Sequence, residues 1–256
     1  MSKTKIEWCD ETINPLVSPQ GGWHCTKIAS GCKNCYAERI NILRGNGIPY
    51  DNRNTIYHLK LEPFRRLPKK PCRVFVQSMS DIFHFDVAHS QLKKIFTEMY
   101  FLTQHTFIIS TKRPARADMH IRWCEDVLLE NLYMLFSTST QKELKEGIKV
   151  FLQVPVKLHG LNLEPLLEPI DCRPYLGGEK RIAWVIVGPE TGTYRRKCRI
   201  KWIENIVEQC RKADVPCFIK ALPIKGKISR NPEEWPVHLR VREFPEEKMR
   251  PEEITF

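Results

Sequence analysis

Three cysteines gather in one short segment of the chain. Cys25, Cys32 and Cys35 have the spacing C-x6-C-x2-C. Thiolates are soft ligands that suit zinc or an iron–sulfur cluster, and two cysteines separated by two residues can reach one metal centre from a single turn. Gly31 is expected to permit the chain reversal that brings Cys25 round. The segment is polar and contains glycine, which is not a core pattern, so it indicates a metal or cluster site.

The number of ligands distinguishes two kinds of site. A structural zinc ion normally has four protein ligands, so zinc would also need His24 or Cys9. A [4Fe–4S] cluster held by Cys25, Cys32 and Cys35 would leave one iron free to bind a small molecule. The spacing alone leaves both sites open.

Polar or glycine-rich residues follow each predicted strand. These strand ends are Ser78–Asp81, Thr111–Arg113, Ser137–Ser139, His159–Gly160 with Asn162–Glu164, Gly188–Gly192, and Lys220. Chemistry gathers at the C-terminal ends of parallel strands, in open sheets and in barrels. The layout therefore predicts an active-site mouth at one edge of a sheet.

Short apolar runs alternate with longer helical patterns along most of the chain. The predicted strands are Lys5–Cys9, Arg73–Gln77, Thr106–Ser110, Leu132–Ser137, Val154–Leu158, Ala183–Val187 and Cys217–Lys220. The predicted helices are 34–43, His89–Thr103, Pro114–Glu130, Gln141–Lys149 and Lys201–Ala213. This alternation predicts an α/β fold with a mainly parallel sheet, either open or closed toward a barrel. No G-x-G-x-x-G follows the first strand, which disfavours a dinucleotide-binding domain.

The chain changes character after Leu222. Prolines and charges become dense from there to residue 256. We expect residues 1–222 to form one α/β domain, and residues 223–256 to form a Pro-rich, charged tail packed on it.

The composition limits the kinds of partner that the protein is expected to bind. The chain has 256 residues with 41 Lys and Arg against 30 Asp and Glu, a net charge of +11. Such an excess suits a polyanion such as nucleic acid, although a basic enzyme with scattered lysines would look the same. No apolar run reaches the length of a membrane span and no signal-type stretch opens the chain. The sequence predicts a cytoplasmic protein with no membrane partner.

Several motifs, in order along nearly the whole chain, resemble the phage gene-product-37/gene-product-68 family, also described as three-Cys-motif proteins. They are Ile6-Glu7-Trp8, Asn14-Pro15, the cysteine run through Tyr36-Ala37-Glu38-Arg39, Ser78–His84, Thr111–Pro114, Leu163–Leu167, Trp184–Gly188 and Arg242–Pro245. That family is in turn similar to radical S-adenosylmethionine (SAM) enzymes, whose usual motif is C-x3-C-x2-C. The first gap here is six residues.

The resemblance implies a fold, cofactors and site roles. The fold would be a partial (β/α)6-type, TIM-like barrel, with a [4Fe–4S] cluster on the three cysteines and SAM at its free iron. By charge, Ser78, Ser80 and Asp81 would bind the methionine ammonium, and Lys112 or Arg113 the carboxylate. Glu164 or Glu190 would hold ribose hydroxyls, and Gly188 would let the backbone approach the adenine. Arg113 and Lys220 are the expected substrate-binding residues.

The resemblance also implies a radical SAM enzyme that forms a 5′-deoxyadenosyl radical, with an electron donor such as flavodoxin or ferredoxin. A nucleic-acid base or a nucleotide is the expected substrate. Two other functions remain: a zinc-stabilised nucleic-acid-binding protein without catalysis, and a non-radical SAM enzyme in which the cysteines only hold a loop. The SAM-binding roles have structural alternatives: Asp81 could cap a helix, and Glu164 could be a charge at a helix N-terminus.

Overall fold

The fold is built on one parallel sheet. The computed structural model describes residues 4–124, 129–178 and 181–247. Seven parallel strands lie in the order β1-β4-β5-β6-β7-β8-β9, and the sheet curls into a half-barrel. The predicted α/β class and partial TIM-like barrel are confirmed, with seven strands in the sheet.

The strands follow chain order across the sheet. They are β1 (Glu11–Ile13), β4 (Arg73–Val76), β5 (Thr106–Thr111), β6 (Leu132–Ser137), β7 (Leu158–Leu163), β8 (Ile182–Val187) and β9 (Cys217–Ile219). Two small antiparallel pairs accompany them: β2 (Leu16–Val17) with β3 (His58–Leu59), and β10 (Leu222–Ile224) with β11 (Lys227–Ser229). Because neighbouring strands are parallel, all seven C-terminal ends lie at one edge.

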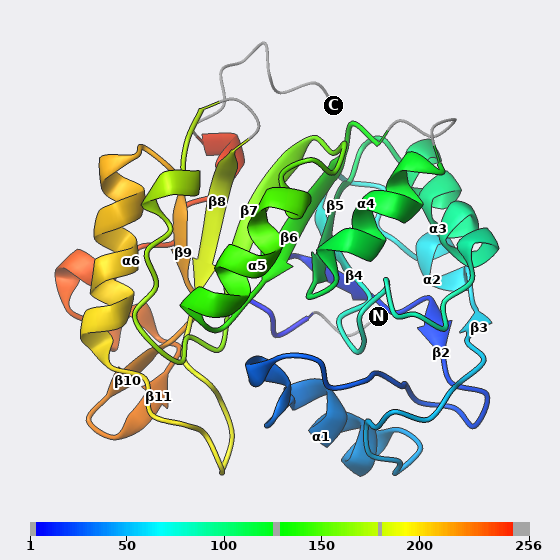
Figure 1. Cartoon of the computed structure of the whole chain (residues 1–256), viewed down its shortest axis with the longest axis horizontal. Coiled ribbons are helices and arrows are strands. Elements are labelled where there is room, and N and C mark those ends of the chain that lie inside the picture. The colour runs from blue at the N-terminus through cyan, green and yellow to red at the C-terminus, as the bar shows by residue number, and fades with distance from the viewer. Residues whose placement is uncertain (1–3, 125–128, 179–180, 248–256) are drawn as a thin grey trace.

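Helices connect most neighbouring strands and cover the outer face (Figure 1). They are α3 (His89–Phe101), α4 (Pro114–Arg122), α5 (Gln141–Phe151) and α6 (Ile200–Lys212). The short α2 (Glu62–Arg65) precedes β4, whereas α1 (Tyr36–Arg44) lies apart from α4, α5 and α6 at the lower edge in Figure 1. Apolar spacing in α5 and α6 buries one side of each helix, for example Leu144, Ile148 and Phe151 in α5.

The inner face of the sheet changes from apolar to polar along the strands. Phe75, Ile108, Leu135, Ile186 and Phe218 pack there as a buried cluster with Trp8 and Trp184. Side chains alternate between the two faces of a strand, so the residue two positions after each of these strand residues also points inward. Those next residues include Gln77, Ser110, Ser137, Gly188 and Lys220. The apolar cluster thus fills the inner face of the sheet, and polar residues lie at its C-terminal edge.

Three predicted elements lie elsewhere. Lys5–Cys9 is not a strand; Trp8 is buried against Phe75, and the first strand is β1. The Val154–Leu158 strand is wrong because β7 begins only at Leu158, after Pro155, which has no N–H for a ladder bond. The helix from Pro114 ends at Arg122, and residues 125–128 of the predicted helix lie outside the described residues.

The end of the chain packs on the sheet as far as it is described. The Ile219 N–H donates to the Val241 carbonyl at 2.9 Å, and the Trp184 indole N–H donates to the Glu243 carbonyl at 3.0 Å. Phe244 lies against Trp184 and Phe218, with the Arg73 guanidinium over its ring. Residues 248–256 of the expected tail lie outside the described part.

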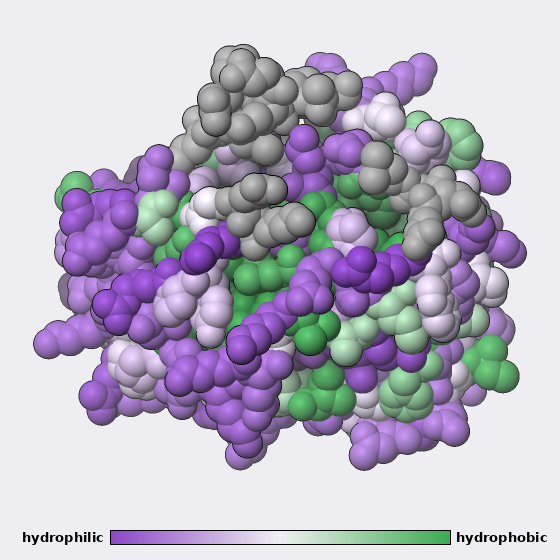
Figure 2. Space-filling model, turned by 45° about the horizontal axis from the view of Figure 1, so that its top comes forward, coloured by the Kyte–Doolittle hydropathy of each residue, from purple (hydrophilic) through white to green (hydrophobic). Residues whose placement is uncertain are grey.

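The surface is mainly polar. Figure 2 shows hydrophilic residues over the flanks of one face and hydrophobic residues gathered near its middle. In the described part of the chain, no helix has the length and apolar character that a bilayer crossing requires.

Candidate functional site

A cavity opens at the C-terminal edge of the sheet. Its empty volume is about 1060 Å³, a figure that includes space open to solvent. It is lined by eleven of the twelve predicted site residues: Cys25, Cys32, Cys35, Ser78, Ser80, Asp81, Lys112, Arg113, Glu164, Glu190 and Lys220. The fold therefore brings residues from the cysteine loop and five strand ends around one space.

The cysteine loop covers one side of the cavity. A 3-10 turn spans Ser30–Cys32, and Cys35 is the N-cap residue of α1. Gly31 does not have a positive φ angle, so the turn at this position does not depend on the backbone freedom of glycine. Gly31 is required for space: a Cβ there would lie 2.4 Å from the Ser139 Oγ and 3.2 Å from the Pro165 Cδ. The loop thus sits directly on the ends of β6 and β7.

The three thiols lie close enough for their charges to interact. Burial raises the pKa of Cys25 to about 12, with Asp81 and Cys35 adding to the shift and Arg113 opposing it. Burial also raises the pKa of Cys35, as does Cys32, whereas the backbone N–H groups of Ala37 and Glu38 lower it. Those N–H groups belong to the first turn of α1, where the helix favours negative charge. A bound metal centre would keep these thiols deprotonated.

The surroundings fit an iron–sulfur cluster. Cys25 and Cys35 pack against a small apolar cluster of Ala37, Tyr50 and Met79, which would limit water at the sulfurs. Neither His24 nor Cys9 lines the cavity. Within the described residues, no three His, Cys, Asp or Glu side chains are placed to hold a single metal ion.

The loop after β4 is fixed by neighbouring side chains. The hydroxyls of Tyr36 and Tyr50 donate to the carbonyls of Ser78 and Met79, each at 2.5 Å. The Ser80 Oγ accepts a hydrogen bond from Gln77 at 2.7 Å. Ser78 and Ser80 therefore line the cavity on a backbone that is held against the cysteine loop.

Asp81 binds the end of β5. Its carboxylate accepts hydrogen bonds from the Thr111 hydroxyl at 2.8 Å and the Lys112 backbone N–H at 2.9 Å. The Arg113 Nε lies 3.9 Å from the same carboxylate, and the Arg113 guanidinium also donates to the Thr26 hydroxyl. The Lys112 ammonium donates to the Ser137 hydroxyl. Asp81 thus joins two strand ends, a structural role that coexists with its place at the cavity.

Glu164 and Lys220 form an ion pair across the ends of β7 and β9. Their Nζ–Oε1 distance is 2.7 Å, and both side chains are nearly buried. Gly188 does not line the cavity but packs behind this pair, where a Cβ would lie 3.4 Å from the Lys220 Cβ. Its N–H donates to Leu163 and its carbonyl accepts from Leu166. The backbone of Gly188 is therefore engaged, and a Cβ at this position would be in ordinary van der Waals contact with Lys220.

Glu190 holds the cysteine loop to the loop after β8. Its carboxylate pairs with the Arg196 guanidinium and accepts from the Asn34 amide at 2.9 Å. The Arg196 guanidinium also donates to the Ser30 carbonyl at 2.9 Å. Although burial opposes it, hydrogen bonds from Arg196 and Asn34 hold the pKa of Glu190 below its usual value. Glu190 is thus an anion committed to this network.

Sequence reasoning did not select Glu143, Arg196 or Ser110, and it listed Asn162 only among the polar residues at a strand end. Glu143, in the first turn of α5, accepts from the N–H groups of Ser30 and Ser139 at 2.7 and 2.8 Å. Arg196 carries the network at Glu190. Asn162 and Ser110 line the cavity floor. The alternation of side chains along β5 and β7 was the signal for the floor residues, since both lie on the inner face.

The comparisons with known proteins give a family. The DUF5131 family, described as a protein of unknown function, matches residues 3–232. The chain belongs to this family. The comparison with curated proteins gives no match. The match shows DUF5131 and not the phage gene-product family, whose resemblance stays a prediction.

Two solved structures are similar to this DUF5131 chain. A cysteine-to-serine mutant of spore photoproduct lyase is 10% identical with a TM-score of 0.48, covering 86% of this chain and 79% of that one. Spore photoproduct lyase complexed with a dinucleoside spore photoproduct is 12% identical with a TM-score of 0.41, covering 78% of this chain and 62% of that one.

Proposed function

We propose that this protein is a radical SAM enzyme. The observation that carries the proposal is the placement of Cys25, Cys32 and Cys35 around one cavity at the C-terminal edge of a partial barrel. Three soft ligands, with neither His24 nor Cys9 lining that cavity, suit a cluster with one free iron. When bound, the reduced cluster would supply the electron that cleaves SAM and releases a 5′-deoxyadenosyl radical.

The chain's own residues would hold and shield the cofactors. Cys25, Cys32 and Cys35 would hold the cluster, and Met79 and Tyr50 keep water from two of the thiols. The Glu143 carboxylate and the Glu190–Arg196 pair fix the loop backbone. A ligand in the cavity thus meets a loop whose position is set before binding.

The polar lining would orient SAM. Ser78, Ser80 and Asp81, which line the cavity, would offer hydroxyls and a carboxylate to its ammonium group. Lys112, next to the Ser137 hydroxyl, would face the carboxylate. The Glu164 carboxylate would meet the ribose hydroxyls. A nucleic-acid base or nucleotide is the substrate class we propose, because the protein carries a net charge of +11.

The test is electron paramagnetic resonance of the protein, reconstituted with iron and sulfide without oxygen and then reduced. The expected spectrum is that of a [4Fe–4S] cluster, changed by SAM and lost in Cys32→Ala, with 5′-deoxyadenosine formed. Cys72→Ala is the matched control, because Cys72 does not line the cavity. Stoichiometric zinc with no cluster and no effect of SAM would instead indicate a metal-stabilised nucleic-acid-binding protein.

A further inference from the structure

An exposed aromatic ring stands among cations beside the cavity. Tyr194, in the loop between β8 and α6, has 85% of its surface exposed. Arg195 and Lys197 flank it and are also exposed. Burying a tyrosine is favourable, so a ring left this open is available for a partner.

Neighbouring segments add positive charge. The Arg195 guanidinium donates to the Gly226 carbonyl at 2.8 Å, which places the tip of the β10–β11 hairpin, with exposed Lys225 and Lys227, beside Tyr194's loop. The Arg39 guanidinium of α1 lies directly against Gly192. No Asp or Glu occurs in residues 25–37, 191–199 or 222–230. We call Tyr194, Arg195, Lys197, Arg39, Lys225 and Lys227 the basic rim.

Hydrogen bonds hold the basic rim to the proposed catalytic cavity. The Asn34 amide, between Cys32 and Cys35, donates to the Tyr194 carbonyl at 2.8 Å. The loop that carries Tyr194 begins with Glu190 and Thr191, which line the cavity. The position of the ring is therefore tied to the position of the cysteine loop.

We propose that the basic rim binds an unpaired nucleic-acid strand, with one base stacked on Tyr194 and the backbone phosphates beside Arg195, Lys197 and Lys225. A ring among cations is the combination that single-strand binders use. An unpaired strand is favoured over a duplex because only an unstacked base offers its face to the ring. Strand binding at the basic rim would bring an adjacent nucleotide to the cavity, an inference that rests on the proposed function.

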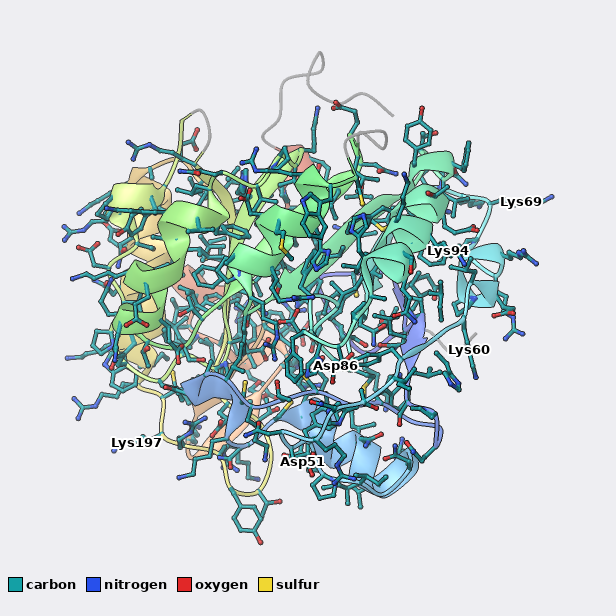
Figure 3. The ribbon with its side chains drawn as sticks, turned by 45° about the vertical axis from the view of Figure 1, so that its right-hand side comes forward. Asp51, Lys60, Lys69, Asp86, Lys94 and Lys197 are labelled. Carbon is teal, nitrogen blue, oxygen red and sulfur yellow. The ribbon has the colours of Figure 1, made fainter. Side chains whose placement is uncertain are left out.

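The experiment is fluorescence anisotropy with a labelled single-stranded DNA, an RNA of the same sequence, and the matching duplex. Tyr194→Ala should weaken single-strand binding by roughly 5- to 100-fold, whereas Tyr194→Phe should retain it. The double variant Lys197→Gln/Lys225→Gln should reduce the salt dependence of log K by about 0.7 for each phosphate that the two lysines neutralise. The control is Lys69→Gln/Lys94→Gln, on the opposite side of the molecule in Figure 3, which should leave binding unchanged.

Three results would overturn the proposal: unchanged binding in Tyr194→Ala, equal or tighter binding of the duplex, or equal competition by polyglutamate, which carries charge without bases. Preference for DNA or for RNA would identify the strand and support the proposal. Binding requires no SAM cleavage, so the two proposals fail separately. If the wild-type protein forms 5′-deoxyadenosine but binds no single strand, only the basic-rim proposal fails. If it binds the strand but forms no 5′-deoxyadenosine, only the radical chemistry fails.

Discussion

The charged residues of the cavity are mostly engaged with each other. Glu164 pairs with Lys220 and Glu190 with Arg196, while Asp81 accepts from the end of β5. Such pairing keeps buried charges stable and holds the strand ends together. Asn162 differs, because its buried Oδ1 has no hydrogen-bond partner among the described residues. A free acceptor in the cavity floor is suited to an N–H or O–H of a ligand.

Asn162→Leu therefore should weaken ligand binding without weakening the fold. Loss of one hydrogen bond predicts a roughly 3- to 10-fold higher Kd for SAM, measured by calorimetry on the reconstituted protein. The free energy of unfolding should stay the same or rise, because the variant removes an unsatisfied buried oxygen. A destabilised Asn162→Leu protein with unchanged SAM affinity would show that Asn162 has only a structural role.

The contact of Gly31 with Ser139 gives a second prediction at this scale. In Gly31→Ala the new methyl group would overlap the Ser139 Oγ, so the cysteine loop must move. We expect a loss of about 1–3 kcal/mol in unfolding free energy and a lower iron content after reconstitution. The double variant Gly31→Ala/Ser139→Ala should recover both, since the Ser139 Oγ has no described partner. No recovery would mean that another contact excludes the methyl group.

At the scale of elements, the cysteine loop is held from two sides. Glu143 of α5 accepts from the backbone of Ser30, and Arg196 of the loop after β8 donates to the carbonyl of the same residue. Both contacts join segments that are distant in sequence. The position of the cysteines therefore depends on the folding of β6 to β8 as well as on their own motif.

Arg196→Met should destabilise the protein, because it leaves the buried Glu190 carboxylate without its cation. We expect a loss of roughly 2 kcal/mol, less than for a fully buried pair since Arg196 is partly exposed. Urea denaturation would measure it, and iron content would report on the loop. Arg196→Met/Glu190→Gln should regain most of the stability, while Arg211→Met, on exposed α6, is the neutral control. Equal losses in all three variants would argue against the pair.

At the scale of the whole molecule, stability depends on buried histidines remote from the site. His120 of α4 is buried. Its Nδ1 lies 3.2 Å from the Nδ1 of His89, and its Nε2 lies 2.9 Å from a guanidinium nitrogen of Arg116. Burial, with the charges of Arg116 and His89, lowers the pKa of His120 to about 4. The folded protein therefore keeps His120 neutral in a pH range where the unfolded chain binds a proton.

The lowered pKa of His120 predicts that the folded protein loses stability over a defined pH range as the solution is acidified. Above the unfolded pKa near 6.5 there is no effect, and as the pH falls toward 4 the unfolded state gains a proton that the folded state lacks. His120 should then cost about 2 kcal/mol of stability between pH 7 and pH 5. Urea denaturation of the protein and of His120→Gln at both pH values would test this. The variant should lose less stability on acidification; parallel losses would assign the effect to other groups.

The sequence determined the class of fold and the membership of the site. Short apolar runs indicate strands, and apolar residues at helical spacing indicate helices. Strands that are parallel to one another have their C-terminal ends at the same edge of the sheet. That rule is enough to place Asp81, Glu164 and Lys220 at one cavity. Local patterning failed at Lys5–Cys9 and Val154–Leu158, where apolar residues pack without forming ladder bonds at the predicted positions.

Only the tertiary structure decided how the site residues are paired. Glu190 lines the cavity and is paired with Arg196 and Asn34, which its sequence position did not indicate. The backbone N–H and carbonyl of Gly188 are bonded to Leu163 and Leu166, and its expected approach to adenine stays a prediction. The Asn162 amide nitrogen donates to the Ser110 Oγ at 3.4 Å, whereas its Oδ1 has no hydrogen-bond partner among the described residues. These outcomes depend on distances between segments far apart in sequence, and such distances are set by packing and register rather than by local pattern.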